Sequence, residues 1–248
     1  MKITGIIAEY NPFHNGHFHQ IEQVKKYGAD YVVIVMSGDF LQRGTPALLD
    51  KWTRTQMALS AGADLVIELP AVFATASAQY FARGGVSILD KLGCVDTISF
   101  GCESDNIRMI HEISSYLRKE PALYKEHLQS FLKEGNSFPK ARELALTLCL
   151  GKEAAAFASS PNNILALEYC ISLLERDSKM NILPIKREGS GYHDANLEAA
   201  TLPSATAIRE LLQKETSDDL LKYVPKSVYS ILNEHSLDYV WQNDFSLL

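Results

Sequence analysis

Three histidines lie within six positions near the start of the chain, at His14, His17 and His19. They follow an apolar run, residues 3–8, with the composition of a buried parallel strand, and they precede a segment with a helical pattern. The residues between include proline, glycine and asparagine, which favour turns. Imidazoles in a turn between a strand and a helix could bind a metal ion, bind a phosphate, or have no chemical role.

A phosphate site is the interpretation that this turn favours. Gly16 lets the backbone approach a ligand closely, and the N-terminus of the next helix offers free N–H groups and the positive end of a dipole. His14 and His17 could donate hydrogen bonds to charge that builds up when an α-phosphate is attacked. A zinc site with Glu9 as a further ligand is the first alternative. Plain turn histidines are the second, and His19 is expected on a helix face.

A second polar group opens a predicted helix near the end of the chain, at Ser204, Thr206 and Arg209. Hydroxyls and a guanidinium can bind the oxygens of an anion. By itself this pattern is weak, because Ser and Thr at a helix start are usually caps and an Arg on a helix is usually solvated.

The hydrophobic pattern supplies the elements that would position these residues. Strands are predicted at 3–8, 31–38, 64–70, 96–104 and 180–188, and helices at 16–27, 48–63, 76–93, 160–176 and 202–214. This alternation predicts an α/β fold with a parallel sheet and helices on both faces. Residues 105–150 carry helical patterns alone and indicate a helical insertion. Asp50 is a plausible N-cap of the second helix.

Composition narrows the class of protein. The 248 residues are 46% hydrophobic and 22% charged, which favours a packed core, and the net charge of -6 argues against general coating of nucleic acid. No apolar run reaches membrane-spanning length, and the N-terminal run is too short for a signal peptide. We therefore expect a cytoplasmic protein. Four cysteines without a CxxC pair indicate reduced, buried thiols: Cys94, Cys102, Cys149 and Cys170.

Two further stretches have both a functional and a plain interpretation. The stretch "LQRGTPALLDKWTR" holds Arg43, Lys51, Trp52 and Arg54, which could contact RNA by phosphate binding and stacking, or could be a helix face with a Trp anchored in the core. The stretch "KREGSGYHD", with His193, could be a loop that closes over substrate or an ordinary surface loop.

The two polar motifs together are more specific than either one alone. "NPFHNGH" after the first strand and "SATAIR" at a late helix start resemble the paired motifs of the nucleotidyltransferase superfamily. Nearly the whole chain resembles the bacterial tRNA(Met) cytidine acetate ligase family. The stretches that carry this resemblance, besides "SATAIR", are "GIIAEYNPFHNGH", "VMSGDFLQRGTPALLDKWTRTQMALSAGADLVIELP", "FARGGVSIL", "FGCES", "PNNILALEY" and "KREGSGYHD". The resemblance implies a Rossmann-like HUP/nucleotidyltransferase fold.

The family's activity gives the residues expected roles. Members activate acetate with ATP to acetyl-adenylate and transfer the acetyl group to N4 of the wobble cytidine of elongator tRNA(Met). The resemblance implies that charge in the transition state is stabilised by His14, His17, Ser204, Thr206 and Arg209. It implies an ATP site formed by Ile7, Ala8, Glu9, Tyr10, Asn11, Pro12, Phe13, Asn15, Gly16, Gln20, Gly101, Asn162, Asn163, Arg187 and Glu188. Mg²⁺ is expected with ATP, and RNA contacts are expected at Arg43, Lys51 and Arg54.

Domain organisation and two alternatives complete the expectations. Residues 1–214 are the expected catalytic domain, and 215–248 a helical extension that would begin a further C-terminal part, because family members are usually longer. The enzymatic alternative is a nucleotidyltransferase that adenylates another small metabolite. The non-enzymatic alternative is a module that binds nucleotide or tRNA without turnover. The product formed with ATP and acetate discriminates between them.

Overall fold

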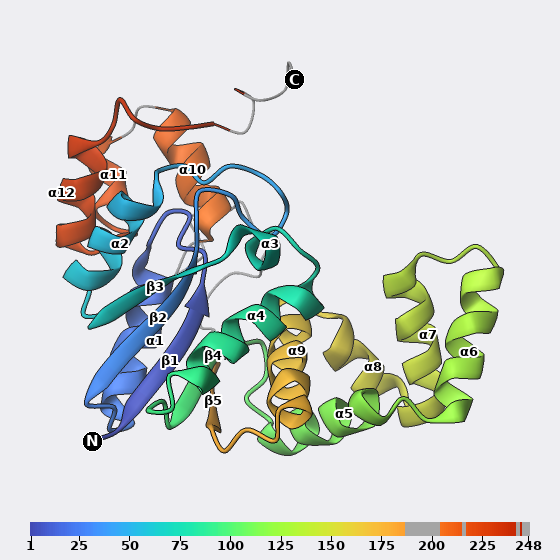
Figure 1. The fold of residues 1–248 in the computed structure, drawn as a ribbon. Coiled ribbons are helices and arrows are strands. Elements are labelled where there is room, and N and C mark those ends of the chain that lie inside the picture. The colour runs from blue at the N-terminus through green and yellow to red at the C-terminus, as the bar shows by residue number, and fades with distance from the viewer. Residues whose placement is uncertain (187–203, 215–216, 242–243, 245–248) are drawn as a thin grey trace.

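A five-stranded parallel sheet is the centre of the fold (Figure 1). The computed structural model describes residues 1–186, 204–214, 217–241 and 244. The strand order is β3-β2-β1-β4-β5, and neighbouring strands of the sheet run parallel. The strands are β1 (Ile3–Ala8), β2 (Tyr31–Ser37), β3 (Leu65–Leu69), β4 (Thr97–Cys102) and β5 (Asn181–Lys186). The predicted α/β fold is therefore confirmed.

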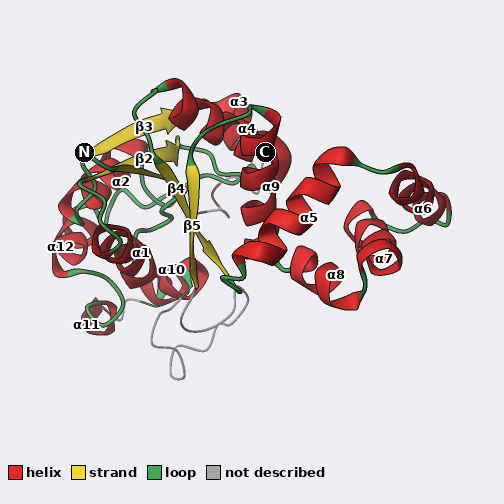
Figure 2. Ribbon diagram, turned by 90° about the horizontal axis from the view of Figure 1, so that it is seen from below, coloured by secondary structure: helices red, strands yellow, loops and turns green. Residues whose placement is uncertain are grey.

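Helices cover both faces of this sheet (Figures 1 and 2). They are α1 (Asn15–Lys26), α2 (Lys51–Ser60), α3 (Ala71–Ala74), α4 (Ala78–Lys91), α5 (Ile107–Lys119), α6 (Ala122–Lys133), α7 (Phe138–Leu150), α8 (Lys152–Ser159), α9 (Pro161–Glu175), α10 (Ala205–Gln213), α11 (Ser217–Leu220) and α12 (Lys226–Glu234). Asp50 caps α2 as predicted, because its carboxylate accepts from the amides of Trp52 and Thr53. The short helix α3 and the helix α8 were not predicted.

Two apolar clusters form the core, one on each face. Along β1, Ile3 and Ile7 belong to the cluster shared with α4, α5 and α9, whereas Ile6 belongs to the cluster shared with α1, α2 and α12. This division follows from the period-two alternation of side chains along a strand. β1 is thus buried from both sides, as its continuous apolar sequence predicts.

A pair of glycines lets α4 lie close to the sheet on one side and to α3 on the other. A Cβ atom on Gly85 would come within 2.5 Å of the Ile7 side chain, and one on Gly84 within 2.5 Å of Phe73. Since real Cβ atoms do not approach neighbours so closely, the Gly pair is explained by close helix packing, which outweighs its unfavourable helix propensity.

The predicted helical part forms an arm beside the sheet. Helices α6, α7 and α8 project away from the strands in both ribbon views (Figures 1 and 2). The ion pair of Arg142 with Glu168, at 3.1 Å, joins α7 to α9, and both side chains are largely buried. Helical structure continues beyond residue 150 through α8.

The described residues after 214 pack on the sheet domain. Leu220, Val228 and Leu232 lie in the same apolar cluster as α2, and the amide of Val240 donates to the carbonyl of Leu48 at 2.8 Å. The division at residue 214 stays a prediction. No helix in the ranges that the structure describes is both long and apolar enough to span a membrane.

Candidate functional site

The histidine turn lies where the order of the sheet reverses. From β1 the chain first builds outward to β2 and β3, and then returns to the other side of β1 with β4. Open α/β sheets bind ligands outside the carboxyl ends of the strands at such a switch point. β1 leads directly into the turn, and the side-chain amide of Gln20 on α1 lies 3.4 Å from the Ser99 hydroxyl of β4. The turn therefore occupies the ligand-binding position of this fold.

Two imidazoles cap the start of α1. Nδ1 of His14 accepts a hydrogen bond from the amide of Gly16 at 3.0 Å, and Nδ1 of His17 accepts from the amide of His14 at 3.3 Å. This is a capping box in which imidazoles replace the usual hydroxyl and carboxylate. The two rings stack, with centroids 3.7 Å apart and planes 22° apart. α1 consequently starts at Asn15, one residue earlier than predicted.

The first amides of α1 have partners within the protein. The amide of Asn15 donates to the carbonyl of Tyr223 at 2.9 Å, that of Gly16 to His14, and that of His17 to the His14 carbonyl at 2.9 Å. The expectation that this helix end offers free N–H groups to a phosphate is therefore wrong. The residues before and after the helix start satisfy these donors instead.

The imidazoles themselves are the donors that this turn can offer. Because each Nδ1 accepts a backbone hydrogen bond, the neutral form of each ring carries its proton on Nε2. The stack with His14 and the edge contact of His17 with Tyr10, at 4.7 Å between centroids, fix the orientation of the His17 ring. Gly16 gives the His14 ring its space, since a Cβ there would lie 2.9 Å from Cε1 of His14.

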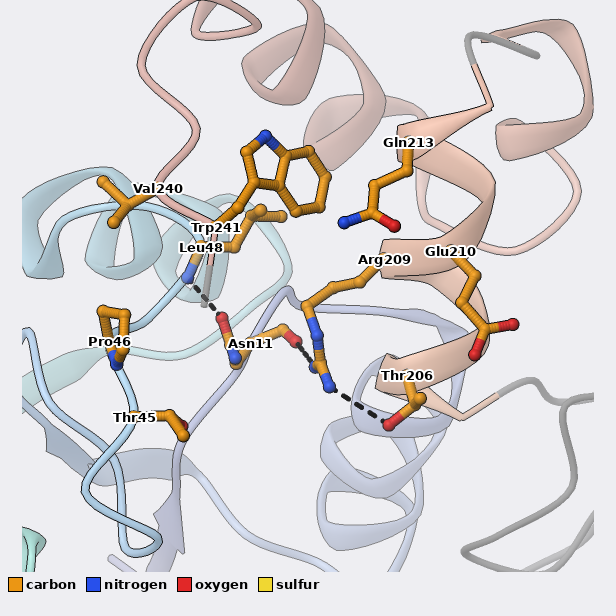
Figure 3. Close-up of a pocket in the computed structure, with 10 residues that line it drawn as sticks. All are labelled: Asn11, Thr45, Pro46, Leu48, Thr206, Arg209, Glu210, Gln213, Val240 and Trp241. Carbon is orange, nitrogen blue, oxygen red and sulfur yellow. Dashed lines mark hydrogen bonds between the residues drawn. The ribbon is translucent and has the colours of Figure 1, made fainter. Parts of the chain in front are cut away.

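The second motif meets the first across 198 residues of sequence. Nη1 of Arg209 donates to the carbonyl of Asn11 at 2.7 Å, and Nη2 donates to the Thr206 hydroxyl at 3.1 Å (Figure 3). The hydroxyl of Ser204 accepts from the amide of Ala207 at 3.2 Å, so it caps α10. The predicted pairing of the two motifs is therefore present in the fold, and Arg209 forms the direct link.

The loop between β2 and α2 holds the turn from the other side. Oδ1 of the buried Asn11 accepts from the amide of Leu48 at 2.6 Å, and Oε1 of Glu9 accepts from the amide of Gln42 at 2.8 Å. Asn11 also precedes a cis peptide bond to Pro12. Side chains of the turn thus satisfy amides of a distant loop.

The structure corrects the RNA-contact prediction for Arg54. This side chain is 0% exposed, so it cannot reach RNA. It donates to the carbonyls of Glu9 at 2.6 Å and Leu49 at 3.0 Å, and also to that of Gly38. Arg54 therefore joins the ends of β1 and β2 to the start of α2. The signal was in the sequence, because Arg54 shares the i, i+3, i+4, i+7 stripe of Met57 and Ala58 on α2 and of Ala61, its C-cap.

The carboxyl group of Glu9 has a pKa that its surroundings raise. Burial raises the pKa of Glu9 above its ordinary value. The hydrogen bond from Gln42 and the positive charges of Arg54, Arg43 and Arg209 oppose this rise without cancelling it. Glu9 therefore lies in the field of three guanidinium groups at the end of β1.

The other predicted residues are placed as follows. Ile7, Tyr10 and Phe13 bury their side chains in the core, so a ligand could meet only their main chain. The side chain of Asn163 accepts from the amide of Glu103, just after β4 and Gly101, and Asn162 lies 3.4 Å from the Glu103 carboxylate. Lys51 forms an ion pair with Glu68 at 2.7 Å, and Arg43 is exposed. Arg187, Glu188 and His193 lie outside the described residues.

A small cavity adjoins the contact between the motifs, and the sequence did not predict it. Its volume is about 180 Å³. Figure 3 shows the lining residues, which are Asn11, Thr45, Pro46, Leu48, Thr206, Arg209, Glu210, Gln213, Val240 and Trp241. Among the described residues, no group of three or more His, Cys, Asp or Glu side chains is arranged to hold a metal ion.

Known proteins match this chain over most of its length. The family described as HIGH Nucleotidyl Transferase matches residues 1–248. The tRNA(Met) cytidine acetate ligase of Clostridium acetobutylicum is 46% identical over 245 residues, which are 95% of this chain and 60% of that protein. The protein of the same name from Caldicellulosiruptor saccharolyticus is 51% identical over 211 residues, 85% of this chain and 52% of that protein.

Solved structures are also similar to this chain over most of its length. Thermotoga maritima TmcAL is 38% identical, with TM-scores of 0.89 for the apo form and 0.86 for the form bound with alpha-thio ATP. Each match covers 95% of this chain, and 57% and 56% of the TmcAL chains. The chain spans about 60% of the length of the first curated relatives that it matches. The family match covers all 248 residues, and the histidine turn contacts the α10 motif. This chain therefore belongs to the HIGH nucleotidyl transferase family.

Proposed function

We propose that this chain activates acetate with ATP to acetyl-adenylate, and that the acetyl group is then transferred to N4 of the wobble cytidine of elongator tRNA(Met). The observation that supports the proposal is the contact between Arg209 and Asn11, which links the α10 motif to the turn that carries the stacked histidines. The names of the relatives and the ATP analogue in the TmcAL structure support the choice of substrates.

The first step needs stabilisation of charge on phosphate. An oxygen of acetate attacks the α-phosphorus of ATP, an O–P bond forms, and the bond to pyrophosphate breaks. Negative charge increases on the phosphate oxygens in the transition state. Nε2–H of His14 and of His17 would donate to these oxygens, and Arg209 would supply positive charge. Donors held in place before the reaction stabilise such charge without reorganisation during it.

The second step is transfer to an amine. N4 of cytidine attacks the acetyl carbonyl, a C–N bond forms, and the C–O bond to AMP breaks with loss of one proton from N4. Mg²⁺ is expected to accompany ATP through its phosphate oxygens. Removal of Mg²⁺ is therefore expected to stop pyrophosphate release, whereas a zinc-selective chelator is expected to have no effect.

The first test is pyrophosphate release from ATP, measured with and without acetate and then with elongator tRNA(Met). Release that depends on acetate and yields acetyl-AMP supports the activation step, and N4-acetylcytidine in the tRNA supports the transfer step. Release with acetate but without modified RNA would restrict residues 1–248 to activation. Absence of acetate-dependent release would contradict the proposal and favour another acceptor or a binding role.

A further inference from the structure

The cavity beside Arg209 has the size of a subsite and not of a whole nucleotide site. Its volume of about 180 Å³ is below the roughly 300–1,000 Å³ of pockets that enclose drug-sized ligands. A single flat ring fits such a space, whereas ATP does not. The cavity shares Asn11, Thr206 and Arg209 with the contact between the motifs, so a ring bound there would lie next to the proposed phosphate site.

The lining of the cavity suits a neutral aromatic ring better than a phosphate. Trp241 offers an indole, with Leu48 and Val240 beside it, and the amide of Gln213 points into the same space (Figure 3). The guanidinium of Arg209 already donates to Asn11 and Thr206. Glu210 adds a negative charge to the lining, which disfavours a polyanion. An aromatic plane with an amide at its edge is the combination by which proteins bind an unstacked nucleobase.

Local contacts hold Trp241 in place. Its indole meets the ring of Tyr239 edge to face at 5.8 Å, and the Tyr239 hydroxyl donates to the carbonyl of Leu232 on α12 at 2.9 Å. The amide of Trp241 donates to the Asp244 carboxylate at 2.7 Å. The ring is therefore oriented before any ligand arrives, which reduces the entropy lost on binding.

One residue connects Trp241 to the histidine turn. The amide of Leu48 donates to the side chain of Asn11, and the carbonyl of Leu48 accepts from the amide of Val240, the neighbour of Trp241. The indole and the turn are thus fixed to the same backbone unit. A base stacked on Trp241 has a defined position relative to the end of β1.

We propose that this cavity receives the acceptor nucleobase of the RNA substrate, stacked on Trp241 with its polar edge toward Gln213. The inference rests on the proposed function, which requires an amine-bearing base close to the acyl-adenylate. An RNA base must leave its stack to enter such a pocket, and stacking on an aromatic side chain compensates part of the cost. In this arrangement Trp241 and Gln213 bind and orient the base, and neither takes part in proton transfer.

The two tryptophans of the chain allow a direct binding test, because Trp52 is 74% exposed on α2 and does not line the cavity. In a W52F variant, Trp241 is the remaining indole. A five-nucleotide RNA with a central cytidine is expected to quench its fluorescence in a saturable manner. The same RNA with an abasic site at the centre is expected to bind about tenfold more weakly, since stacking of one base is typically worth about that much. Equal quenching by both RNAs, or none by either, would overturn the proposal that this cavity binds the nucleobase.

Matched variants locate the stacking residue. Anisotropy of the labelled cytidine RNA is compared for W241L, W52L and Q213A, with thermal unfolding as the control for folding. W241L is expected to weaken binding about tenfold and Q213A severalfold, with no change in W52L. Loss in W52L but not in W241L would assign RNA binding to α2 and overturn the proposal. These measurements contain neither ATP nor acetate, so a failure of acetate-dependent pyrophosphate release contradicts the proposed function by itself.

Discussion

The histidine turn and the helical arm are held together in different ways. Hydrogen bonds between distant segments fix the turn, and they involve Glu9, Asn11, Arg54 and Arg209. In the arm, helices that are adjacent in sequence pack together by apolar contact, and Arg142 adds one ion pair to α9. Apolar packing tolerates small shifts, whereas a hydrogen bond fails with a change of an ångström. The difference indicates that hydrogen bonds fix the position of the turn, whereas apolar packing holds the arm.

The largest effect is expected from Arg54→Met. Methionine has a similar length but cannot donate to the three carbonyls at the ends of β1 and β2 and the start of α2, two of which lie in fully buried hydrogen bonds. Unsatisfied buried groups cost roughly 1–3 kcal/mol each, so we expect a loss on the order of 3 kcal/mol in the free energy of unfolding. Urea denaturation measures it. The control Arg54→Lys keeps the charge but not the planar guanidinium, and its free energy of unfolding is expected to be intermediate. A free energy of unfolding equal to that of the wild type in Arg54→Met would refute the bridging role.

His17→Ala is expected to reduce acetate-dependent pyrophosphate release by about 10²-fold, because it removes a donor to the transition state. His14→Asn separates capping from catalysis, since asparagine is a good N-cap but lacks Nε2. We expect His14→Asn to keep its unfolding free energy within roughly 0.5 kcal/mol and to lose activity. Pyrophosphate release and urea denaturation are measured on the same samples. Unchanged turnover in His17→Ala would remove the turn from the mechanism.

Arg142→Met tests the arm. It leaves the largely buried Glu168 without its ion-pair partner, and we expect a loss of about 2 kcal/mol in unfolding free energy. Pyrophosphate release per folded molecule should not change, because none of the residues that line the cavity beside Arg209 comes from the arm. A double variant with Glu168→Gln should recover part of the stability. Should activity fall in proportion to stability, the separation between arm and turn would be incorrect.

The smallest effect is expected from Glu9→Gln, and it depends on pH. Burial raises the pKa of Glu9, so the folded state retains a proton that the unfolded state releases. The free energy of unfolding of the wild type therefore falls as pH rises from about 4.5 through the raised pKa. Above that pKa the full cost of burying the ionised carboxylate is present. Glutamine keeps an acceptor for Gln42 and lacks this cost. Unfolding curves from pH 4 to 8 should show Glu9→Gln gaining relative stability with rising pH; a constant difference would contradict the assignment.

Sequence patterns located the elements better than the partners of individual side chains. Strand β1 and the cap Asp50 were predictable, because they depend on apolar runs and on neighbours within three residues. The hydrogen bond from the amide of Asn15 to the carbonyl of Tyr223 was not predictable, since it joins segments that only the fold brings together. For the same reason the sequence indicated free amides at the start of α1, where the structure places partners. The charge of Arg54 indicates a surface cation, whereas its place on an apolar stripe indicates the buried side chain that the structure shows.

The sequence by itself determined the parallel sheet, the turn of histidines after β1 and the identity of the residues in both motifs. Periodicity and local capping depend on residues that are close in sequence, so they can be predicted from the sequence alone. Only the tertiary structure decided that both imidazoles use Nδ1 to cap α1, that Arg209 reaches Asn11, and that Trp241 adjoins the same contact. Each of these depends on the direction of a hydrogen bond or on contact between distant segments, which packing sets and sequence spacing does not.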